Sequence, residues 1–222
     1  MNRIYFYKLT NDDGGAPCVE AGMLSLAICK PRLRSTAQAH KTEGDIVLGL
    51  AADKLERTSK LSKGNKLIYA ARIQAKETDG KYYKRKKYAK RGDCIYEFIG
   101  GQFVHKKKAK YHGTVEDQKK DIGPQPYKNA NVLLSKDFRY FGRLPSVDYR
   151  RIYPAIGQAV TKLQRGHRID HTQALERELH ALISDIWRLP QPAKIRHCSK
   201  PSKGVCYHQT KCSSFRLKGP KC

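Results

Sequence analysis

The sequence predicts an α+β fold, a small mixed sheet or partly open β-barrel followed by two C-terminal helices. Two observations carry this prediction. Before Pro145 the chain holds several short runs of apolar, β-branched and aromatic residues with irregular connections, which is typical of strands. After Pro145 the apolar residues recur with helical spacing. The chain has 222 residues, 39% of them hydrophobic, which is enough to bury a core.

The N-terminal part supplies the predicted strands. Ile4 to Leu9 is the first, and the turn-forming residues Asn11 to Gly15 follow it. Pro31 begins a short predicted helix that runs through Ala37, because proline suits the first helical turn. Further strands are expected at Met23–Cys29, Ile46–Leu50, Leu67–Ile73, Cys94–Ile99 and Asn131–Ser135.

The C-terminal part supplies two predicted helices. The first runs from Ile152 to Gln164, and Gly166 ends it. Thr172 can cap the second, which ends before Pro190. Its apolar stripe, which we expect to face the core, consists of Leu175, Leu179, Leu182, Ile183, Ile186 and Trp187. We therefore expect a domain over residues 1–190 and an appended tail over 191–222.

The tail combines eight Lys and Arg residues with four cysteines, no acidic residue and little periodicity. This composition favours a segment that is disordered or folded around a metal. Four of its six Cys and His side chains could hold zinc, although no Cys-x-x-Cys pair is present. The six are His197, Cys198, Cys206, His208, Cys212 and Cys222. No other cofactor is indicated.

The net charge of +25 predicts contact with a polyanion. Lys81 to Arg91 concentrates this property, since seven of its eleven residues are basic and three are tyrosines. Basic groups neutralise phosphates and aromatic rings stack on bases, so nucleic acid is the expected partner. No apolar run is long enough to span a membrane, and no signal peptide is evident, so a cytoplasmic location is expected.

Several segments together resemble a known family. They are Gly22–Arg34, Gly44–Gly49, Leu67–Ala70, Arg91–Tyr96 and Leu133–Gly142. The chain resembles, over about residues 3–188, the second of the numbered nucleotide-modification-associated domain families of bacteria and phages. The resemblance implies a link to systems that alter nucleic-acid bases. The glycine–aspartate turns are also similar, more loosely, to small barrels that bind modified bases.

Basic residues near the predicted first helix are candidates for phosphate contact. Lys30, Arg32 and Arg34 follow Cys29, whose thiol their charges would activate as a nucleophile. No base is evident near Cys29 in the sequence, which favours a packing role for it. The other candidates for nucleic-acid contact are Tyr82, Tyr83, Arg85, Arg91 and Tyr140.

Carboxylates are scarce in so basic a chain, so the few near turns are candidates for acid–base work. We nominate Asp13, Asp93 and His112. Ordinary turn chemistry is the favoured explanation of Asp12, Asp13, Asp45 and Asp93, because each adjoins a glycine or a turn. We expect the family-like segments around Lys30, Asp45, Asp93 and Tyr140 to border one cavity.

The sequence thus favours a nucleic-acid-associated protein of a base-modification pathway, which binds or acts on a modified base or nucleotide. The alternative is a basic structural protein that coats DNA or RNA without selecting a base. Whether the chain is an enzyme stays open. No Walker loop, dinucleotide fingerprint or zinc-deaminase motif is present, which disfavours those enzyme classes.

Overall fold

The centre of the molecule is a mixed sheet of five strands in the order β10–β5–β4–β1–β11. The computed structural model describes residues 2–61, 63–190, 195–196 and 206–207. β1 (Ile4–Leu9) runs parallel to β4 (Ile46–Ala51), and the remaining pairs are antiparallel. The other strands are β5 (Leu67–Arg72), β10 (Asp137–Tyr140) and β11 (His167–Arg168).

A second sheet is antiparallel and has the order β2–β3–β9–β6. Its strands are β2 (Cys18–Glu20), β3 (Met23–Leu26), β9 (Val132–Ser135) and β6 (Ala75–Glu77). Two further pairs are the hairpin of β7 (Tyr96–Ile99) and β8 (Gln102–His105), and β12 (Ile195–Arg196) with β13 (Cys206–Tyr207). The α+β class is confirmed, and the described residues form no closed barrel.

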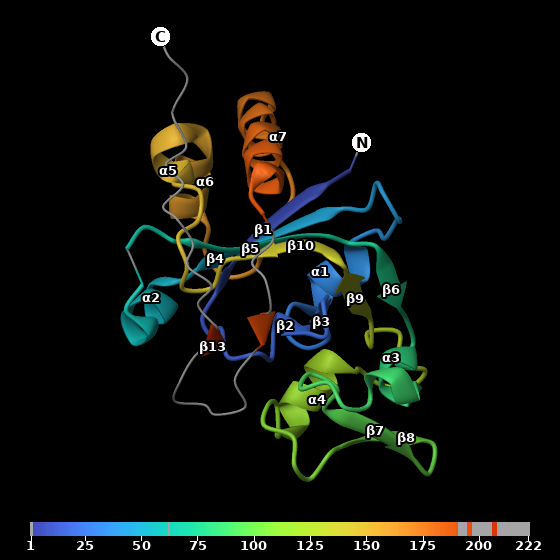
Figure 1. Cartoon of the computed structure of the whole chain (residues 1–222). Coiled ribbons are helices and arrows are strands. Elements are labelled where there is room, and N and C mark those ends of the chain that lie inside the picture. The colour runs from blue at the N-terminus through green and yellow to red at the C-terminus, as the bar shows by residue number, and fades with distance from the viewer. Residues whose placement is uncertain (1, 62, 191–194, 197–205, 208–222) are drawn as a thin grey trace.

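The helices are short except for the last. Along the chain they are α1 (Pro31–Thr36), α2 (Asp53–Ser59), α3 (Lys81–Lys84), the 3-10 turn η1 (Lys86–Tyr88), α4 (Val115–Asp121), α5 (Tyr149–Ile152), α6 (Pro154–Lys162) and α7 (Gln173–Arg188). Figure 1 shows α6 and α7 on one side of the five-stranded sheet, with the second sheet and α1 on the other.

Alternation along β1 explains these layers. Ile4 and Phe6 pack in the cluster that contains the buried residues of α6 and α7. Tyr5, Tyr7 and Leu9 pack in the cluster that contains β3 and α1. Successive side chains of a strand point to opposite faces, so a strand that is buried on both sides carries apolar residues throughout.

The helical prediction is confirmed for α7 and needs one correction before it. Thr172 caps α7, since its Oγ1 accepts a hydrogen bond from the Leu175 backbone N–H at 3.4 Å. The predicted single helix from Ile152 to Gln164 is divided at Tyr153 into α5 and α6. Pro154 opens α6 because a proline lacks the N–H that a continuous helix requires.

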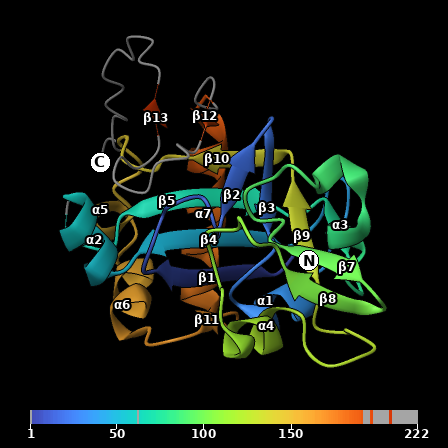
Figure 2. The same ribbon diagram turned by 90° about the horizontal axis from the view of Figure 1, so that it is seen from below.

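A third cluster of buried residues lies beneath α3, η1, β7 and β8. Figure 2 shows α3 and the β7–β8 hairpin beside the second sheet, away from α6. The cluster includes Tyr82, Tyr83 and Tyr88, which are at most 5% exposed. The basic-aromatic stretch therefore has an inward aromatic side and an outward basic side.

Candidate active site

Cys29 lies between the end of β3 and the start of α1, in a left-handed backbone conformation. Its φ is 60°, and that of the following Lys30 is 45°. Such values are uncommon for residues other than glycine. The turn leaves Cys29 partly exposed, whereas Cys18 and Cys94 are buried.

A histidine and an aspartate line up with the Cys29 thiol. The Cys29 Sγ lies 3.3 Å from Nε2 of His112, and the Nδ1 of the same ring lies 2.5 Å from Oδ2 of Asp121. His112 belongs to the loop between β8 and α4, and Asp121 is the last residue of α4. Sulfur, imidazole and carboxylate in this order form the relay that activates cysteine nucleophiles.

Asp121 is fully buried and its carboxylate is held by several donors. The Tyr96 hydroxyl donates to Oδ2 at 3.0 Å, and the Cys29 backbone N–H donates to Oδ1 at 3.0 Å. The carboxylate therefore fixes both the imidazole and the backbone of the cysteine. Such a partner sets which ring nitrogen of the histidine carries the proton.

Arg34, a predicted phosphate contact, is instead fully buried behind this group. Its Nε donates to the Cys29 carbonyl at 2.7 Å, and its Nη2 donates to the Asp121 carbonyl at 3.2 Å. Its Nη1 also donates to the Asn131 carbonyl. The guanidinium thus ties the turn at Cys29 to the end of α4, and it offers no surface to a phosphate.

The electrostatics of the group favour a positively charged histidine. The hydrogen bond with Asp121, and next that with Cys29, raise the pKa of His112 to about 10, against an opposing effect of burial. His112 is therefore an imidazolium at neutral pH. A cation beside a thiol favours the thiolate, which is the nucleophilic form of cysteine.

The surface beside Cys29 is basic. Lys30 lies with its Nζ 4.8 Å from the centre of the Tyr7 ring and donates to the Gly166 carbonyl at 3.2 Å. Burial, and next the charges of Lys30 and Arg32, lower the pKa of His167. Lys30 and Arg32 therefore supply the positive charge near the thiol, while the lowered pKa favours a neutral His167 ring; phosphate contact by these two residues stays a prediction.

Tyr140 belongs to a neighbouring group rather than to an open base pocket. Its hydroxyl donates to both oxygens of Asp12, at 2.6 and 2.7 Å, and the residue is fully buried. Burial raises the pKa of Asp12 to about 6. The buried Tyr7 and Tyr69 hydroxyls lie 2.8 Å apart.

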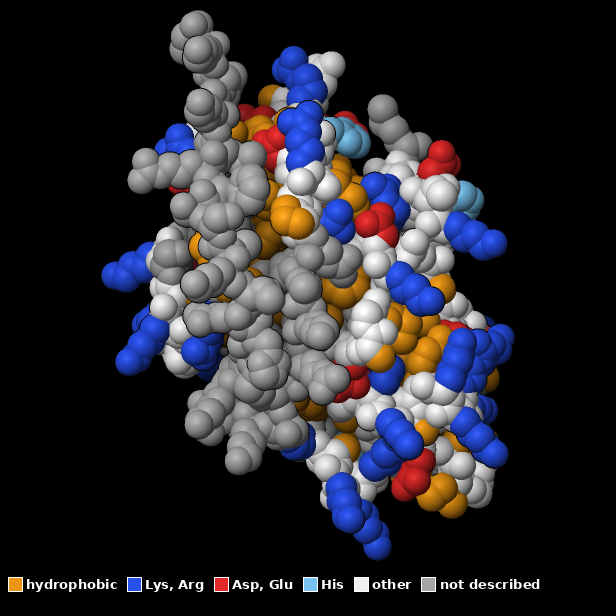
Figure 3. Space-filling view, viewed as in Figure 1, with side chains coloured by type: hydrophobic (Ala, Val, Ile, Leu, Met, Phe, Trp, Pro, Cys, Tyr) orange, Lys and Arg blue, Asp and Glu red, His pale blue; other side chains and the backbone are white. Residues whose placement is uncertain are grey.

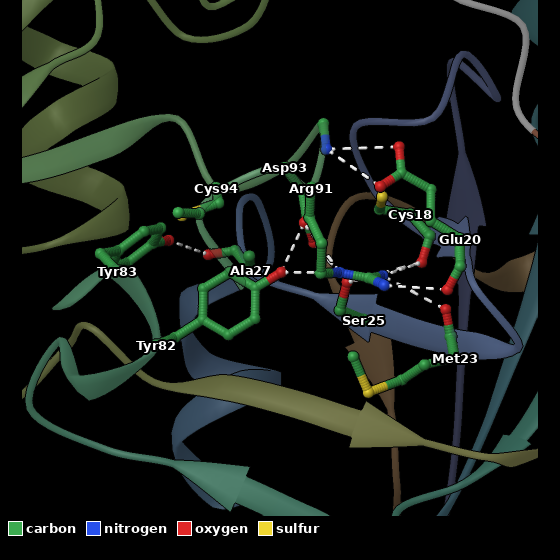
Figure 4. A network of polar contacts seen from close by, with 12 residues as sticks. Cys18, Glu20, Met23, Ser25, Ala27, Tyr82, Tyr83, Arg91, Asp93 and Cys94 are labelled. Atoms are coloured by element: carbon green, nitrogen blue, oxygen red, sulfur yellow. Dashed lines mark hydrogen bonds and ion pairs between the residues drawn. The ribbon is translucent and has the colours of Figure 1, made fainter. Parts of the chain in front are cut away.

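Asp93 and Arg91 form an internal network that joins β2, β3 and α3 (Figure 4). The Asp93 carboxylate accepts from the Ser25 hydroxyl at 2.5 Å and from the Tyr82 hydroxyl at 2.6 Å. Arg91 donates to Ser25 Oγ at 2.7 Å and to the Glu20 carbonyl at 3.0 Å. Both residues are buried and these contacts are internal, so catalysis by Asp93 and phosphate contact by Arg91 stay predictions that this burial does not favour.

The remaining predicted site residues each contact different partners. The Tyr83 hydroxyl donates to the Ala27 carbonyl at 2.8 Å, so neither Tyr82 nor Tyr83 offers a ring to a base. Arg85 is exposed and bonds Glu77 at 2.6 Å. Asp13 is exposed and its Oδ1 accepts from the Gly15 N–H at 3.2 Å, which is ordinary turn chemistry.

The polar residues of the family-like segments contact different partners in the described part of the chain, and a cavity that they share stays a prediction. Asp93 and Tyr140 have the separate partners described above, while Asp45 accepts from the Arg3 and Gln38 backbone N–H groups at 2.9 and 2.8 Å. Gly44 is required by packing, because a Cβ there would lie 1.7 Å from the Ile73 carbonyl oxygen. The glycine–aspartate turn at 44–45 is thus structural.

A basic hollow of about 630 Å³ opens between the end of α2 and the loop after β10. Its walls are tied together, since Arg150 Nη2 donates to Asn65 Oδ1 at 2.8 Å and the Tyr149 hydroxyl donates to the Asn65 carbonyl at 2.8 Å. Burial lowers the pKa of Lys66, in its lining, to about 8. Cys29, His112 and Asp121 do not line this hollow.

Sequence reasoning named Cys29 and His112 separately and missed Asp121. The three are joined only by folding, because His112 lies 83 residues from Cys29 along the chain. The scarcity of acidic residues was a usable signal, yet Asp121 follows a helical lysine pair and borders no glycine turn. Within the described residues, no group of three or more potential ligands is placed to hold a metal ion. The predicted zinc ligands of the tail lie outside the residues whose side chains are described.

The fold thus brings a cysteine, a histidine and an aspartate into direct contact in an α+β protein. A family model described as nucleotide modification associated domain 2 matches residues 1–197, and the chain belongs to this family. The resemblance drawn from the sequence is confirmed. The searches of curated proteins and of solved structures found no significant match. Every helix in the described part of the chain is too short or too polar to cross a membrane.

Proposed function

We propose that this protein is an enzyme of nucleotide modification that uses Cys29 as its nucleophile. The observation that carries the proposal is the continuous contact from Cys29 Sγ through the His112 ring to Asp121. The sulfur would attack an electrophilic carbon of a base, or of a group attached to a base. The electron pair displaced from that carbon passes to its heteroatom, and His112 gives the Nε2 proton to that atom.

The substrate class follows from the family and from the charges near the thiol. Membership of a nucleotide-modification family supports a nucleotide or nucleic-acid substrate. Lys30 and Arg32 follow the nucleophile closely in sequence and supply positive charge near it. Phosphate groups bind readily to such clusters, so we place a phosphate of the substrate at Lys30 and Arg32.

The geometry favours this group over the acidic residues nominated from the sequence. A group that does acid–base work must reach the atom that gains or loses the proton. Asp93 is fully buried and already accepts two short hydrogen bonds, and Asp13 is exposed in a turn. His112 is partly exposed and contacts the thiol directly.

Thiol labelling by iodoacetamide tests the proposal in the full-length chain, with each cysteine resolved by peptide mass. We expect Cys29 to react at neutral pH at least about tenfold faster than Cys18 and Cys94, whose pKa values are raised by burial. Mononucleotides or a short oligonucleotide should slow labelling of Cys29 alone, and comparing them identifies the substrate size. His112→Gln should slow Cys29 labelling to the rate of an ordinary accessible thiol, because the sulfur stays partly exposed.

Two results would overturn the proposal. One is equal labelling of Cys29 in the parent chain and in His112→Gln, which would show that the imidazole does not activate the sulfur. The other is labelling of Cys29 that neither mononucleotides nor oligonucleotides slow at any concentration tested.

A further inference from the structure

The β7–β8 hairpin carries exposed apolar side chains at a position that no part of the proposed chemistry uses. Phe98 is 39% exposed, Ile99 is 59% exposed and Val104 is 41% exposed. Gly100 and Gly101 turn the chain at the tip with φ values of 57° and 82°, and nothing lies within 4 Å of a Cβ built on either. The tip is therefore narrow, apolar and unobstructed among the described residues.

Lys84 lies against this hairpin, and further exposed lysines lie in the segments that precede and follow it. The Lys84 Nζ lies 3.7 Å from the centre of the Phe98 ring. Lys106 Nζ donates to the Cys94 carbonyl at 2.6 Å and to the Ala89 carbonyl at 3.1 Å, which ties the basic stretch to the base of the hairpin. We define the hairpin surface as Phe98, Ile99 and Val104 with the exposed lysines Lys81, Lys84, Lys86, Lys87, Lys90, Lys107 and Lys108.

Figure 3 shows this combination from one side, with Lys and Arg side chains around hydrophobic ones at the lower right, where Figure 1 places α3 and the hairpin. Glu97 is the only acidic residue of β7 and β8. The surface therefore joins strong positive charge to exposed apolar area, which a simple solvated charge cluster would not require.

The tip is held from behind, so its shape does not depend on a partner. Phe98 packs edge-on against Phe103 with ring centres 4.9 Å apart, and Phe103 packs against Tyr127 at 4.8 Å. Gln125 Nε2 donates to the Gly101 carbonyl at 3.1 Å. These contacts brace the hairpin and leave Ile99 as the most exposed apolar residue at its end.

We propose that the hairpin surface binds single-stranded nucleic acid, with Ile99 packed against a base and the lysines on the phosphates. A strand that alternates anionic phosphates with flat apolar base faces matches an apolar tip that has Lys84 at its side and further exposed lysines in the flanking segments. Double-stranded nucleic acid hides those base faces in its stack. An acidic protein partner would match the lysines and leave the apolar tip unexplained.

The buried tyrosines acquire a role in this arrangement. Tyr82, Tyr83 and Tyr88 anchor the basic stretch to the third cluster, so that its lysines project outward beside the hairpin. In this proposal the apolar hairpin tip contacts the bases, because the tyrosines are buried. This inference shares its ligand class with the proposed function but does not depend on Cys29.

Binding of a short single-stranded oligonucleotide that carries 2-aminopurine, followed by anisotropy and base fluorescence, tests this inference in the full-length chain. Ile99→Ser should weaken binding about tenfold, remove the fluorescence change and leave the salt dependence unaltered. Lys84→Ala combined with Lys87→Ala should weaken binding and reduce the slope against log salt by about 1 to 2. Val115→Ser is the matched control, because Val115 is 62% exposed and lies outside the hairpin.

The outcomes distinguish binding of nucleic acid from binding of another protein at the hairpin surface. Unchanged binding in both Ile99→Ser and the double lysine variant would overturn the inference. Absence of oligonucleotide binding by the parent chain, with self-association lost in Ile99→Ser, would assign the surface to protein contact and would also overturn it. Because Ile99 lies outside the Cys29 group, its variant should keep the parent rate of Cys29 labelling, which separates this test from that of the proposed function.

Discussion

At the scale of single residues, the Cys29 group depends on backbone conformations that side chains seldom adopt. Cys29, Lys30 and His112 all have positive φ, at 60°, 45° and 50°. Each such residue costs free energy that neighbouring contacts must offset. Arg34 and Asp121 supply those contacts through the Cys29 carbonyl and N–H. The left-handed turn at Cys29 and the buried pair of Arg34 and Asp121 therefore position the sulfur together.

The charge of His112 predicts a specific dependence of stability on pH. Its pKa rises from an ordinary 6.5 to about 10 in the folded chain, chiefly through Asp121. The stabilisation that it contributes is thus fully present below about pH 6.5 and is lost as the pH rises towards 10. Urea unfolding at about pH 6, 8 and 10 should show a larger fall in the free energy of unfolding for the parent than for His112→Gln.

Parallel pH profiles of the parent and His112→Gln would contradict the assignment, since both chains share every other titrating group. Asp121→Asn offers a second check. It keeps the side-chain volume but removes the negative charge that chiefly raises the pKa, so its profile should resemble that of His112→Gln.

The residues of this group show what sequence reasoning can reach. Composition and the short basic run after Cys29 indicated a thiol in a positive environment. The sequence nominated His112 for acid–base work, but pairing it with Cys29 and Asp121 required the fold, because the loop after β8 and the end of α4 meet Cys29 only through tertiary packing. The sequence predicted a phosphate contact for Arg34, whereas the structure buries it. A guanidinium group suits a buried ion pair as well as a phosphate, so the residue type alone could not separate the two.

At the scale of elements, the basic-aromatic stretch is amphipathic in a way that its sequence conceals. It divides into α3 and η1, each only three or four residues long. Their tyrosines turn inward and all their lysines outward. A segment this short gives too little periodicity to separate aromatic rings that stack on bases from rings that anchor the chain.

The network around Asp93 predicts a structural phenotype. Asp93→Asn removes the charge that faces Arg91 Nε at 3.6 Å, in a site that is closed to water. We expect a loss of about 3–5 kcal/mol in the free energy of unfolding, as for other broken buried pairs. Urea unfolding measures it, and Asp13→Asn, at an exposed turn, should change little. A variant as stable as the parent that binds nucleotide but has lost turnover would instead make Asp93 a catalytic residue.

Most strands were predictable because each is a compact apolar run. The ends of the strands were less predictable. β3 ends at Leu26, although the apolar run continues to Cys29. The residues beyond it leave the sheet because the chain must bend into the left-handed turn before α1. Pro154 shows the same principle in the C-terminal part, where one backbone rule outweighed a continuous helical pattern.

At the scale of the whole molecule, the two faces of the five-stranded sheet are covered by different layers. The face covered by α6 and α7 holds an apolar cluster that stabilises the sheet. The opposite side carries the second sheet, and around it lie the Cys29 group, the Asp93 network and the hairpin surface. The net charge of +25 alone therefore does not locate a binding site. The cations that lie beside a thiol or an apolar tip indicate where a ligand would bind.

The central claim is that His112 and Asp121 activate Cys29, and the rate of Cys29 alkylation by iodoacetamide at one near-neutral pH tests it most directly. The His112 ring lies 3.3 Å from the Cys29 sulfur and contacts Asp121 on its other side. The parent chain should therefore be alkylated at Cys29 at least about tenfold faster than His112→Gln and Asp121→Asn. Equal rates in the parent and in both variants would contradict this claim.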